Sequence, residues 1–408
     1  MRLLCLSNGH GEDQIAVHIL TELRRLEPDW AIAALPLVGE GHAFAAAQIE
    51  RIGPRQVLPS GGFLNQDWRQ FFRDLAGGLT GLTFGQWQAV QQWSQAGGAV
   101  LAVGDIVPLL FAWASDRPFA FVATAKSDYY WRDEQGLLPI TAATMLWSRW
   151  QRSYFDPWDR WLMKHRHCRA VFPRDRLTTE GLQQLGVPAI AAGNPMMDGL
   201  EAPDTEAWSS LLPDGSRWLL LPGSRPPEAQ RNWVQLISAL PVNPDRAFVA
   251  LAAIAPSLPL AEITQALSDR GWQPATSPIP EAIAFQRGAG WCLLGQRHFA
   301  PFLQMAEGAI AMAGTATEQC VGLGKPAFTI AGQGPQFTRG FAEAQTRLLG
   351  RSVQLLSKPS DFLSAWEVYQ SDPAKREAIA ANGRLRLGEA GAAARIAEIV
   401  RSQLLESA

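Results

Sequence analysis

The sequence predicts an α/β protein with two doubly wound domains, and three observations lead to this prediction. The chain has 408 residues, more than one ordinary core accommodates at roughly 150 residues per domain. In both halves, short apolar runs alternate with helical stretches, the pattern of a parallel sheet covered by helices. Hydrophobic residues make up 47% and charged residues 18% of the chain, which excludes a disordered protein.

The N-terminal half contains apolar runs that end in turn residues, as buried strands do. The expected strands are 2–6, 31–35, 57–58, 99–103, 119–122 and 170–172, with an amphipathic helix at 13–26.

The C-terminal half repeats this alternation as five β/α units. Its expected strands are 218–221, 248–252, 291–294, 309–313 and 326–330, and its expected helices are 227–240, 260–270, 301–307 and 318–323. The chain ends in a helix at 391–405, whose apolar residues recur on one face, so we expect it to pack back on the protein.

Prolines and glycines mark a linker between the two halves. We therefore expect an N-terminal Rossmann-like domain at 1–193, a linker at 194–208, a C-terminal Rossmann-like domain at 209–375 and C-terminal helices at 376–408.

Charge and cysteine content narrow the class of protein. The net charge of -2 argues against a dedicated nucleic-acid binder. The sequence contains neither C-x-x-C nor H-E-x-x-H, so we expect no zinc site and no disulfide scaffold. Cys5, Cys168, Cys292 and Cys320 are expected to be reduced, mostly buried thiols of a cytosolic protein. We expect no signal peptide, because the first apolar run is too short for an h-region and leads into a glycine turn. We expect no transmembrane helix, because no apolar run reaches about 18 residues.

A glycine loop at 7–13 follows the first expected strand and opens the first helix. Its glycines let the backbone approach a ligand closely, and we predict an acceptor site formed by Asn8, Gly9, Gly11 and Glu12. His10 lies between the glycines and can take a proton from a hydroxyl group, since the usual pKa of histidine is ~6.5. The alternative is a plain helix cap, with a structural role for His10.

A second loop, Gly223-Ser224-Arg225, follows the expected strand 218–221. Gly223 and Ser224 leave backbone N–H groups open at a helix N-terminus, where a phosphate binds well. Arg225 can donate two parallel hydrogen bonds to a phosphate. The loop is not a Walker A motif, because no G-x-x-x-x-G-K-[ST] occurs.

A third loop follows the expected strand 309–313 and comprises Gly314, Thr315, Ala316, Thr317 and Glu318. It lacks the third glycine of a dinucleotide motif, but its hydroxyls and helix N-terminus suit a phosphate, and Glu318 can bind a ribose diol. Alternatively, Glu318 is only a favourable first-turn carboxylate. Because the second and third loops both follow strands of one doubly wound sheet, together they predict a nucleoside diphosphate site.

These loops resemble those of lipid-A-disaccharide synthases, and most closely the lipid-A-disaccharide-synthase-related proteins. The motifs concerned are 221–225 followed by Glu228, 314–318, and Gly193-Asn194-Pro195-Met196-Met197-Asp198. The resemblance implies a GT-B glycosyltransferase, with two Rossmann-like domains facing a cleft and no cofactor. It implies a UDP-sugar donor in the C-terminal domain and a lipid or amphiphilic acceptor in the N-terminal domain.

The resemblance also suggests roles for two further positions. Asp105, in Val103-Gly104-Asp105-Ile106, falls where the synthases place a functional aspartate, although their Pro-Asp-Phe-Asn context is absent. Gln336, in the loop 332–336, is expected to face the sugar or the diphosphate. The alternatives are a helix cap for Asp105 and a glycine-rich connection for the loop.

The residues favour a metal-independent transfer. No D-x-D triplet occurs among the 18 aspartates, so helix N-termini and Arg225 are expected to neutralise the leaving UDP. We expect His10 to be the base that activates the acceptor hydroxyl, with Asp105 orienting it or the acceptor. Partial burial of Asp105 would raise its pKa toward a useful range.

Tryptophan content and charge distribution favour a membrane-facing segment at about 66–98. No charged residue occurs between Leu75 and Gly104, and the chain has 16 Trp against 4 Tyr. The stretch 149–176 adds eight Lys and Arg residues interleaved with Trp, as on a surface that binds anionic lipid. We therefore expect a cytoplasmic protein, peripheral on the inner face of a membrane. The alternative is an ordinary core.

Two other functions fit the same pattern. A UDP-sugar 2-epimerase shares the fold but needs no acceptor surface, and a non-catalytic nucleotide-sugar-binding protein would keep only the donor site. We expect no nucleic-acid partner, and the sequence leaves open whether the protein is a monomer or a homodimer.

Overall fold

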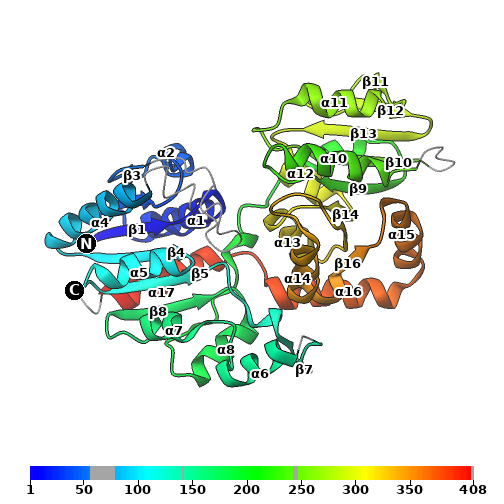
Figure 1. Ribbon diagram of the computed structural model, residues 1–408. Coiled ribbons are helices and arrows are strands. Elements are labelled where there is room, and N and C mark those ends of the chain that lie inside the picture. The colour runs from blue at the N-terminus through cyan, green and yellow to red at the C-terminus, as the bar shows by residue number, and fades with distance from the viewer. Residues whose placement is uncertain (56–78, 140–141, 242–246, 406–408) are drawn as a thin grey trace. The chain divides into compact units, whose positions relative to one another are not determined.

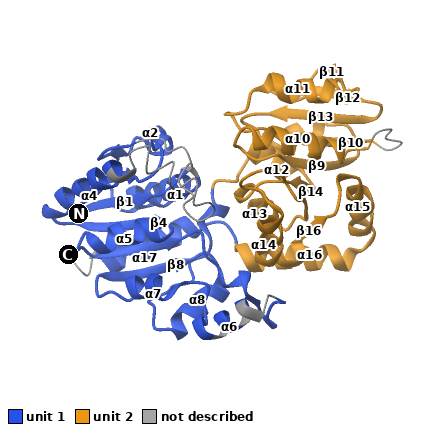
Figure 2. Cartoon of the chain, in the orientation of Figure 1, with its two compact units in different colours: residues 1–198, 389–408 blue, residues 199–388 orange. Residues whose placement is uncertain are grey.

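The computed structural model describes residues 1–55, 79–139, 142–241 and 247–405, which fold into two compact units (Figures 1 and 2). Unit 1 comprises Met1–Asp198 and Glu389–Ala408, and unit 2 comprises Gly199–Gly388. The first crossing between the units falls within the linker predicted at 194–208. The second falls within the predicted C-terminal helices, so the last helix belongs to unit 1.

Unit 1 is built on a parallel sheet of six strands in the order β3-β2-β1-β4-β5-β8. The strands are β1 Arg2–Ser7, β2 Ala31–Pro36, β3 Glu50–Arg51, β4 Ala99–Gly104, β5 Phe119–Ala123 and β8 Cys168–Pro173. Five expected strands are confirmed, and β3, of two residues, is an addition. The strand expected at 57–58 lies outside the described residues.

Helices cover both faces of this sheet (Figure 1). One face packs against α1 His10–Leu26, α2 His42–Ala46 and α17 Ala392–Leu405. The other packs against α4 Leu79–Gln95, α5 Ile106–Ala114 and α7 Pro157–Met163. The expected last helix is confirmed as α17, whose Ile396, Val400 and Leu404 are fully buried.

A long connection follows β5 in unit 1. It contains the short helix η1 Asp128–Tyr130, the hairpin of β6 Arg132–Asp133 and β7 Gly136–Leu137, and α6 Ala142–Gln151. Helix α8 Arg176–Gln184 and the short helix η2 Pro195–Met197 follow β8.

Unit 2 contains an eight-stranded sheet in the order β11-β12-β13-β10-β9-β14-β15-β16. Its strands are β9 Ser216–Leu221, β10 Phe248–Ala253, β11 Gln273–Ala275, β12 Ile283–Arg287, β13 Gly290–Gly295, β14 Gly308–Ala311, β15 Ala327–Ile330 and β16 Val353–Leu356. The five expected strands are confirmed as β9, β10, β13, β14 and β15, and they pair with one another in parallel. The antiparallel pair β11–β12 and the parallel strand β16 are additions.

Along the chain, the helices of unit 2 begin before the first of these strands, alternate with the strands and continue after the last one (Figure 1). They are α9 Thr205–Leu211, α10 Glu228–Ser238, α11 Leu260–Ser268, α12 Phe299–Met305, α13 Thr315–Gly322, α14 Arg339–Leu349, α15 Phe362–Ser371 and α16 Pro373–Leu387, with the short helices η3 Gly350–Ser352 and η4 Pro359–Asp361. The four expected helices are confirmed as α10, α11, α12 and α13.

The tryptophans occupy different environments in the two units. In unit 2, Trp218, Trp233, Trp272 and Trp366 are core residues, as the alternative to a membrane role predicts. In unit 1, several tryptophans of α4, α6 and α7 are exposed instead.

All four cysteines are buried and free, as expected. Within the described ranges, no helix combines the length and the apolar character that a bilayer crossing requires.

Asp198 is the last residue before the chain first passes from unit 1 to unit 2, and it hydrogen-bonds the segment where the chain returns to unit 1. Its carboxylate accepts hydrogen bonds from the backbone N–H groups of Gly391 and Ala393, the latter at 2.6 Å. Arg395 of α17 donates from Nε to the carbonyl oxygen of Ala192 at 2.8 Å. Asp198 therefore caps the start of α17 and joins the two segments through which the chain passes between the units.

Substituting Asp198→Ala is expected to destabilise unit 1 by about 1–3 kcal/mol, because two backbone donors lose a charged acceptor. Urea unfolding monitored by circular dichroism measures the change. Asp204→Ala is the matched control, because Asp204 precedes α9 without a capping hydrogen bond from its side chain. Equal stability of the two variants would contradict this role for Asp198.

Candidate functional site

Three loops of unit 2 lie at the carboxyl ends of neighbouring parallel strands. The loop with Gly223, Ser224 and Arg225 follows β9, the Gly314 loop follows β14, and the loop 332–336 follows β15. Strand β14 pairs with both β9 and β15, so the three loops are adjacent. A Cβ atom on Gly223 would stand 3.3 Å from the carbonyl oxygen of Met312, at the end of β14. The structure thus brings the predicted donor residues to one edge of the sheet.

Glu228, the first residue of α10, fixes the loop 332–336. Its Oε1 accepts a hydrogen bond from the N–H of Phe337 at 2.6 Å, and its Oε2 accepts one from Gln336 at 3.2 Å. A Cβ atom on Gly334 would lie 2.1 Å from Cδ of Glu228, so this close approach requires glycine. Gln336, a predicted donor residue, is therefore positioned by Glu228, whose carboxylate is buried and bonded to the backbone.

The Gly314 loop is held by two side chains. Gln345 of α14 donates from Nε2 to the carbonyl oxygen of Ala313 at 3.0 Å, and the Thr317 hydroxyl donates to the same oxygen at 2.6 Å. Thr317 is fully buried, whereas Thr315 is exposed. Gly314 is the N-cap of α13 and provides no side chain to cover the helix N-terminus. This terminus therefore offers backbone donors and the Thr315 hydroxyl to an anion.

In unit 1, the first loop meets the loop that follows β4. Strands β1 and β4 are neighbours, and the Asn8 side chain hydrogen-bonds the Asp105 carboxyl. A Cβ atom on Gly104 would stand 1.9 Å from Oδ1 of Asn8, so glycine permits this approach. Asp105 is also the N-cap of α5, since its Oδ1 accepts a hydrogen bond from the N–H of Val107 at 2.9 Å. Two predicted acceptor-side residues are thus in contact. Asp105 also caps a helix, which was the alternative role predicted for it.

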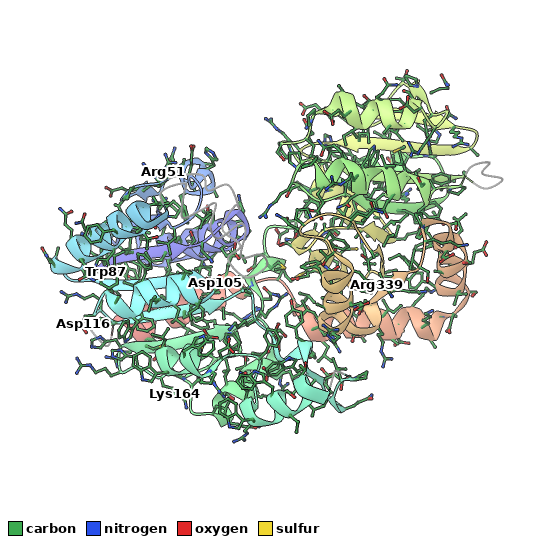
Figure 3. The ribbon with its side chains drawn as sticks, viewed as in Figure 1. Arg51, Trp87, Asp105, Asp116, Lys164 and Arg339 are labelled. Atoms are coloured by element: carbon green, nitrogen blue, oxygen red, sulfur yellow. The ribbon has the colours of Figure 1, made fainter. Side chains whose placement is uncertain are left out.

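Burial raises the pKa of Asp105, and this effect exceeds the lowering by its hydrogen bonds with Val107 and Asn8 and by the charge of Lys126. The direction agrees with the expectation from sequence. Figure 3 shows Asp105 at the carboxyl end of the unit 1 sheet. A carboxyl group with a raised pKa suits a base better than an ordinary aspartate does.

Lys126 lies two residues beyond Thr124, directly after β5, and was not among the predicted site residues. Its Nζ contacts Oδ2 of Asp156 at 2.6 Å and also bonds to Asp159. Burial alone would lower the pKa of Lys126, but these carboxylates outweigh burial and raise it. Lys126, Asp105 and Asp159 line one small cavity of about 10 Å³ in unit 1. The acceptor-side edge therefore combines a stabilised ammonium group with a buried carboxyl group.

The first turn of α1 contributes two more carboxyl groups. Glu12 accepts a hydrogen bond from the Thr124 hydroxyl at 3.3 Å, which links the first loop to the end of β5. Asp13 is 1% exposed and accepts a hydrogen bond from Ser7. Burial raises the pKa of Asp13 to about 7, helped by Glu12 and opposed by the Ser7 hydrogen bond. Asp13 is thus a buried group that titrates near neutrality.

The other predicted residues of the first loop lie at the start of α1. Gly9 is the N-cap of α1, His10 is its first residue and Gly11 its second. The side chain of His10 lies outside the described part of the structure. Among the described residues, no group of three or more His, Cys, Asp and Glu side chains has the arrangement of a metal site.

No protein-family model matches the sequence, and no curated protein matches it. Solved structures, in contrast, match along the whole chain. The calicheamicin glycosyltransferase CalG4 is 15% identical, with a TM-score of 0.61 over 100% of this chain and 99% of that one. UDP-GlcNAc 2-epimerase from Neisseria meningitidis, bound to UDP-GlcNAc, is 13% identical, with a TM-score of 0.54 over 100% of both chains. MurG of Acinetobacter baumannii is 12% identical, with a TM-score of 0.54 over 98% of this chain and 99% of that one.

These similarities, with the parallel strands that make up most of the two sheets, establish the fold. The chain has the α/β GT-B architecture of two Rossmann-like domains, as predicted. The neighbours include both glycosyltransferases and 2-epimerases, so the fold is compatible with either reaction.

Asp13→Asn is expected to stabilise the protein at pH 8 and to flatten its stability between pH 8 and pH 5. The pKa of Asp13 is about 7 in the folded state, whereas in the unfolded state it is near the usual aspartate value of 3.8. Wild-type stability therefore rises as pH falls through 7, and the variant escapes a burial cost of up to about 4 kcal/mol above pH 7. Urea unfolding at both pH values measures the difference. Exposed Asp29→Asn is the control, and parallel pH profiles of Asp13→Asn and wild type would disprove this account.

Proposed function

We propose that this chain is a metal-independent glycosyltransferase that moves a sugar from a UDP-sugar donor to a lipid or amphiphilic acceptor. The observation that carries the proposal is the set of three adjacent loops at the carboxyl edge of the unit 2 sheet. In open α/β sheets, this edge is where ligands bind.

In this proposal, unit 2 binds the donor. The amide groups at the start of α13, with Ser224 and Arg225, bind the diphosphate and stabilise its charge as UDP leaves. Glu318, buried in the first turn of α13, binds the ribose, and Gln336 faces the sugar from the loop that Glu228 fixes. The support is that Glu228 holds the loop 332–336 and Gln345 holds the Gly314 loop at this edge of the sheet.

Unit 1 would bind the acceptor through Asn8, Gly9, Gly11 and Glu12. The acceptor hydroxyl loses its proton to His10 or Asp105, and its oxygen attacks the anomeric carbon as the bond to UDP breaks. The raised pKa of Asp105 supports a part for it in this step. The motif resemblance to lipid-A-disaccharide synthases favours a lipid-like acceptor, and we propose that the enzyme acts at the inner face of a membrane.

A second candidate is a UDP-sugar 2-epimerase. It is favoured by the similarity to the Neisseria meningitidis epimerase bound to UDP-GlcNAc. The two reactions differ in a direct assay, because an epimerase converts the UDP-sugar alone, whereas a transferase releases UDP only with an acceptor. A nucleotide-sugar-binding protein without turnover would bind UDP and do neither.

Arg225→Ala is expected to weaken UDP binding by roughly ten- to a hundredfold, because it removes a charge-assisted contact of about 1.5–3 kcal/mol. Isothermal titration calorimetry with UDP measures the change. Arg231→Ala is the matched control, since Arg231 is exposed on α10. Unchanged UDP affinity in a folded Arg225→Ala protein would refute the donor assignment.

Loss of the base is expected to lower turnover by about 10²–10⁴-fold while UDP affinity stays the same. His10→Ala and Asp105→Asn test the two candidates separately. Asparagine at position 105 can still accept the Val107 hydrogen bond, so this variant removes the base and keeps the helix cap. If both variants keep near-normal turnover, neither residue is the base and the proposed mechanism is wrong.

A further inference from the structure

Two neighbouring surface helices of unit 1 carry no charged residue. Helix α4, Leu79–Gln95, and helix α5, Ile106–Ala114, contain no Asp, Glu, Lys or Arg. Both pack on the same face of the sheet, and each also has apolar side chains on its outer side. Phe84 is 63% exposed, Trp87 38% and Leu110 44%. A helix layer that faces only water normally carries charges on its outer side.

Helix α7 extends this apolar surface. Trp158 is 55% exposed and Trp161 60%. Ring contacts link the three helices, because Trp87 of α4 meets Phe111 of α5 at 6.1 Å and Trp113 of α5 meets Trp161 of α7 at 5.5 Å. We call the exposed residues Phe84, Trp87, Leu110, Trp158 and Trp161 the aromatic face.

Helix α6 adds a second aromatic cluster beside α7. Leu146, Trp147 and Trp150 are exposed, and the two indole rings lie 5.0 Å apart. Arg160 of α7 donates from Nη1 to the carbonyl oxygen of Gln151, the last residue of α6, at 2.6 Å. This hydrogen bond joins the two helices.

The charges near the aromatic face are mainly positive. Arg152, Lys164 and Arg166 are exposed around α7, whereas the carboxylates of Asp156 and Asp159 are occupied by Lys126. The exposed acid Asp116 lies beside His167, with Oδ1 and Nδ1 3.2 Å apart. Figure 3 shows Trp87 on α4 and Lys164 beyond α7.

We propose that the aromatic face docks on an anionic lipid bilayer. Exposed Trp and Phe side chains enter the interfacial zone, where an aromatic ring is half in hydrocarbon and half in headgroups. Lys164, Arg166 and Arg152 add attraction to anionic headgroups. A partner protein surface would meet an aromatic patch without needing this bias toward positive charge.

This inference deepens the proposed function, on which it rests for the identity of the acceptor. Helix α5 begins directly after Asp105, which caps it, and exposes Leu110 on the aromatic face. The same helix therefore joins the candidate acceptor site to the surface that would contact lipid.

Vesicle co-sedimentation tests the proposal on the full chain, with phosphatidylglycerol–phosphatidylcholine vesicles and with pure phosphatidylcholine vesicles. Phe84→Glu combined with Trp158→Glu places two charges on the aromatic face, and we expect at least tenfold weaker binding to the anionic vesicles. Val368→Glu combined with Leu385→Glu is the matched control, since these residues are 54% and 51% exposed in unit 2. Equal binding by the two double variants would overturn the proposal.

The electrostatic part has its own test. Lys164→Glu combined with Arg166→Glu is expected to weaken binding to anionic vesicles roughly tenfold or more and to leave binding to neutral vesicles unchanged. Arg351→Glu combined with Lys358→Glu, both exposed in unit 2, is the control. Loss of binding in the control pair alone would place the lipid contact elsewhere and refute the aromatic face.

Two further readouts separate this inference from the proposed function. UDP titration of the same variants should be unaffected, so vesicle binding without UDP binding would reject the enzyme and keep the docking face. Sedimentation velocity in the absence of lipid tests a second copy as the occupant. If wild type is a dimer that Phe84→Glu with Trp158→Glu dissociates, and neither protein binds vesicles, the face is a subunit interface and the lipid proposal is wrong.

Discussion

The carboxyl edge of a parallel sheet is the constraint on which both candidate sites depend. All parallel strands end at the same edge, so the residues after β1, β4 and β5 gather in unit 1 and those after β9, β14 and β15 gather in unit 2. Because the strands are buried on both faces, carboxyl groups at this edge lose hydration. Burial is accordingly the largest cause of the raised pKa values of Asp13 and Asp105. Burial at this edge is therefore enough to raise the pKa of a carboxyl group toward neutrality, and no special sequence motif is needed.

The carboxyl groups at the two sheet edges have different sets of partners. In unit 1 the partners include an ammonium group, since Lys126 contacts Asp156 and Asp159, and a backbone amide, since the N–H of Val107 donates to Asp105. In unit 2, Glu228 accepts hydrogen bonds from the backbone N–H groups of Gln336 and Phe337. The unit 2 arrangement fixes the loop 332–336 beside the N-terminus of α13, which suits a site for a large anion. The unit 1 arrangement keeps side chains that exchange protons, which suits the chemistry of a hydroxyl group.

Positions after strands were predictable from the sequence, whereas tertiary partners were not. Apolar runs located the strands, and the loops after them included Asp105, Gly223 and Gly314. The same rule would have selected Lys126, since it follows the strand predicted at 119–122 by a few residues. Asp159 had no such signal, because it reaches Lys126 from a helix 33 positions further along the chain. The β11–β12 pair was missed because Gln, Pro and Arg interrupt its apolar pattern.

Helix α5 connects the core, the candidate acceptor site and the aromatic face. Its Leu109 and Phe111 are buried against the sheet, its N-cap is Asp105, and Leu110 is exposed on the outer side. Nine residues at about 1.5 Å each give a helix of about 14 Å. If the aromatic face rests on a bilayer, Leu110 contacts the lipid, and the helix holds Asp105 at about 7.5 Å from Leu110 along its axis. An acceptor could then keep its hydrocarbon tail in the bilayer while its hydroxyl group reaches Asp105.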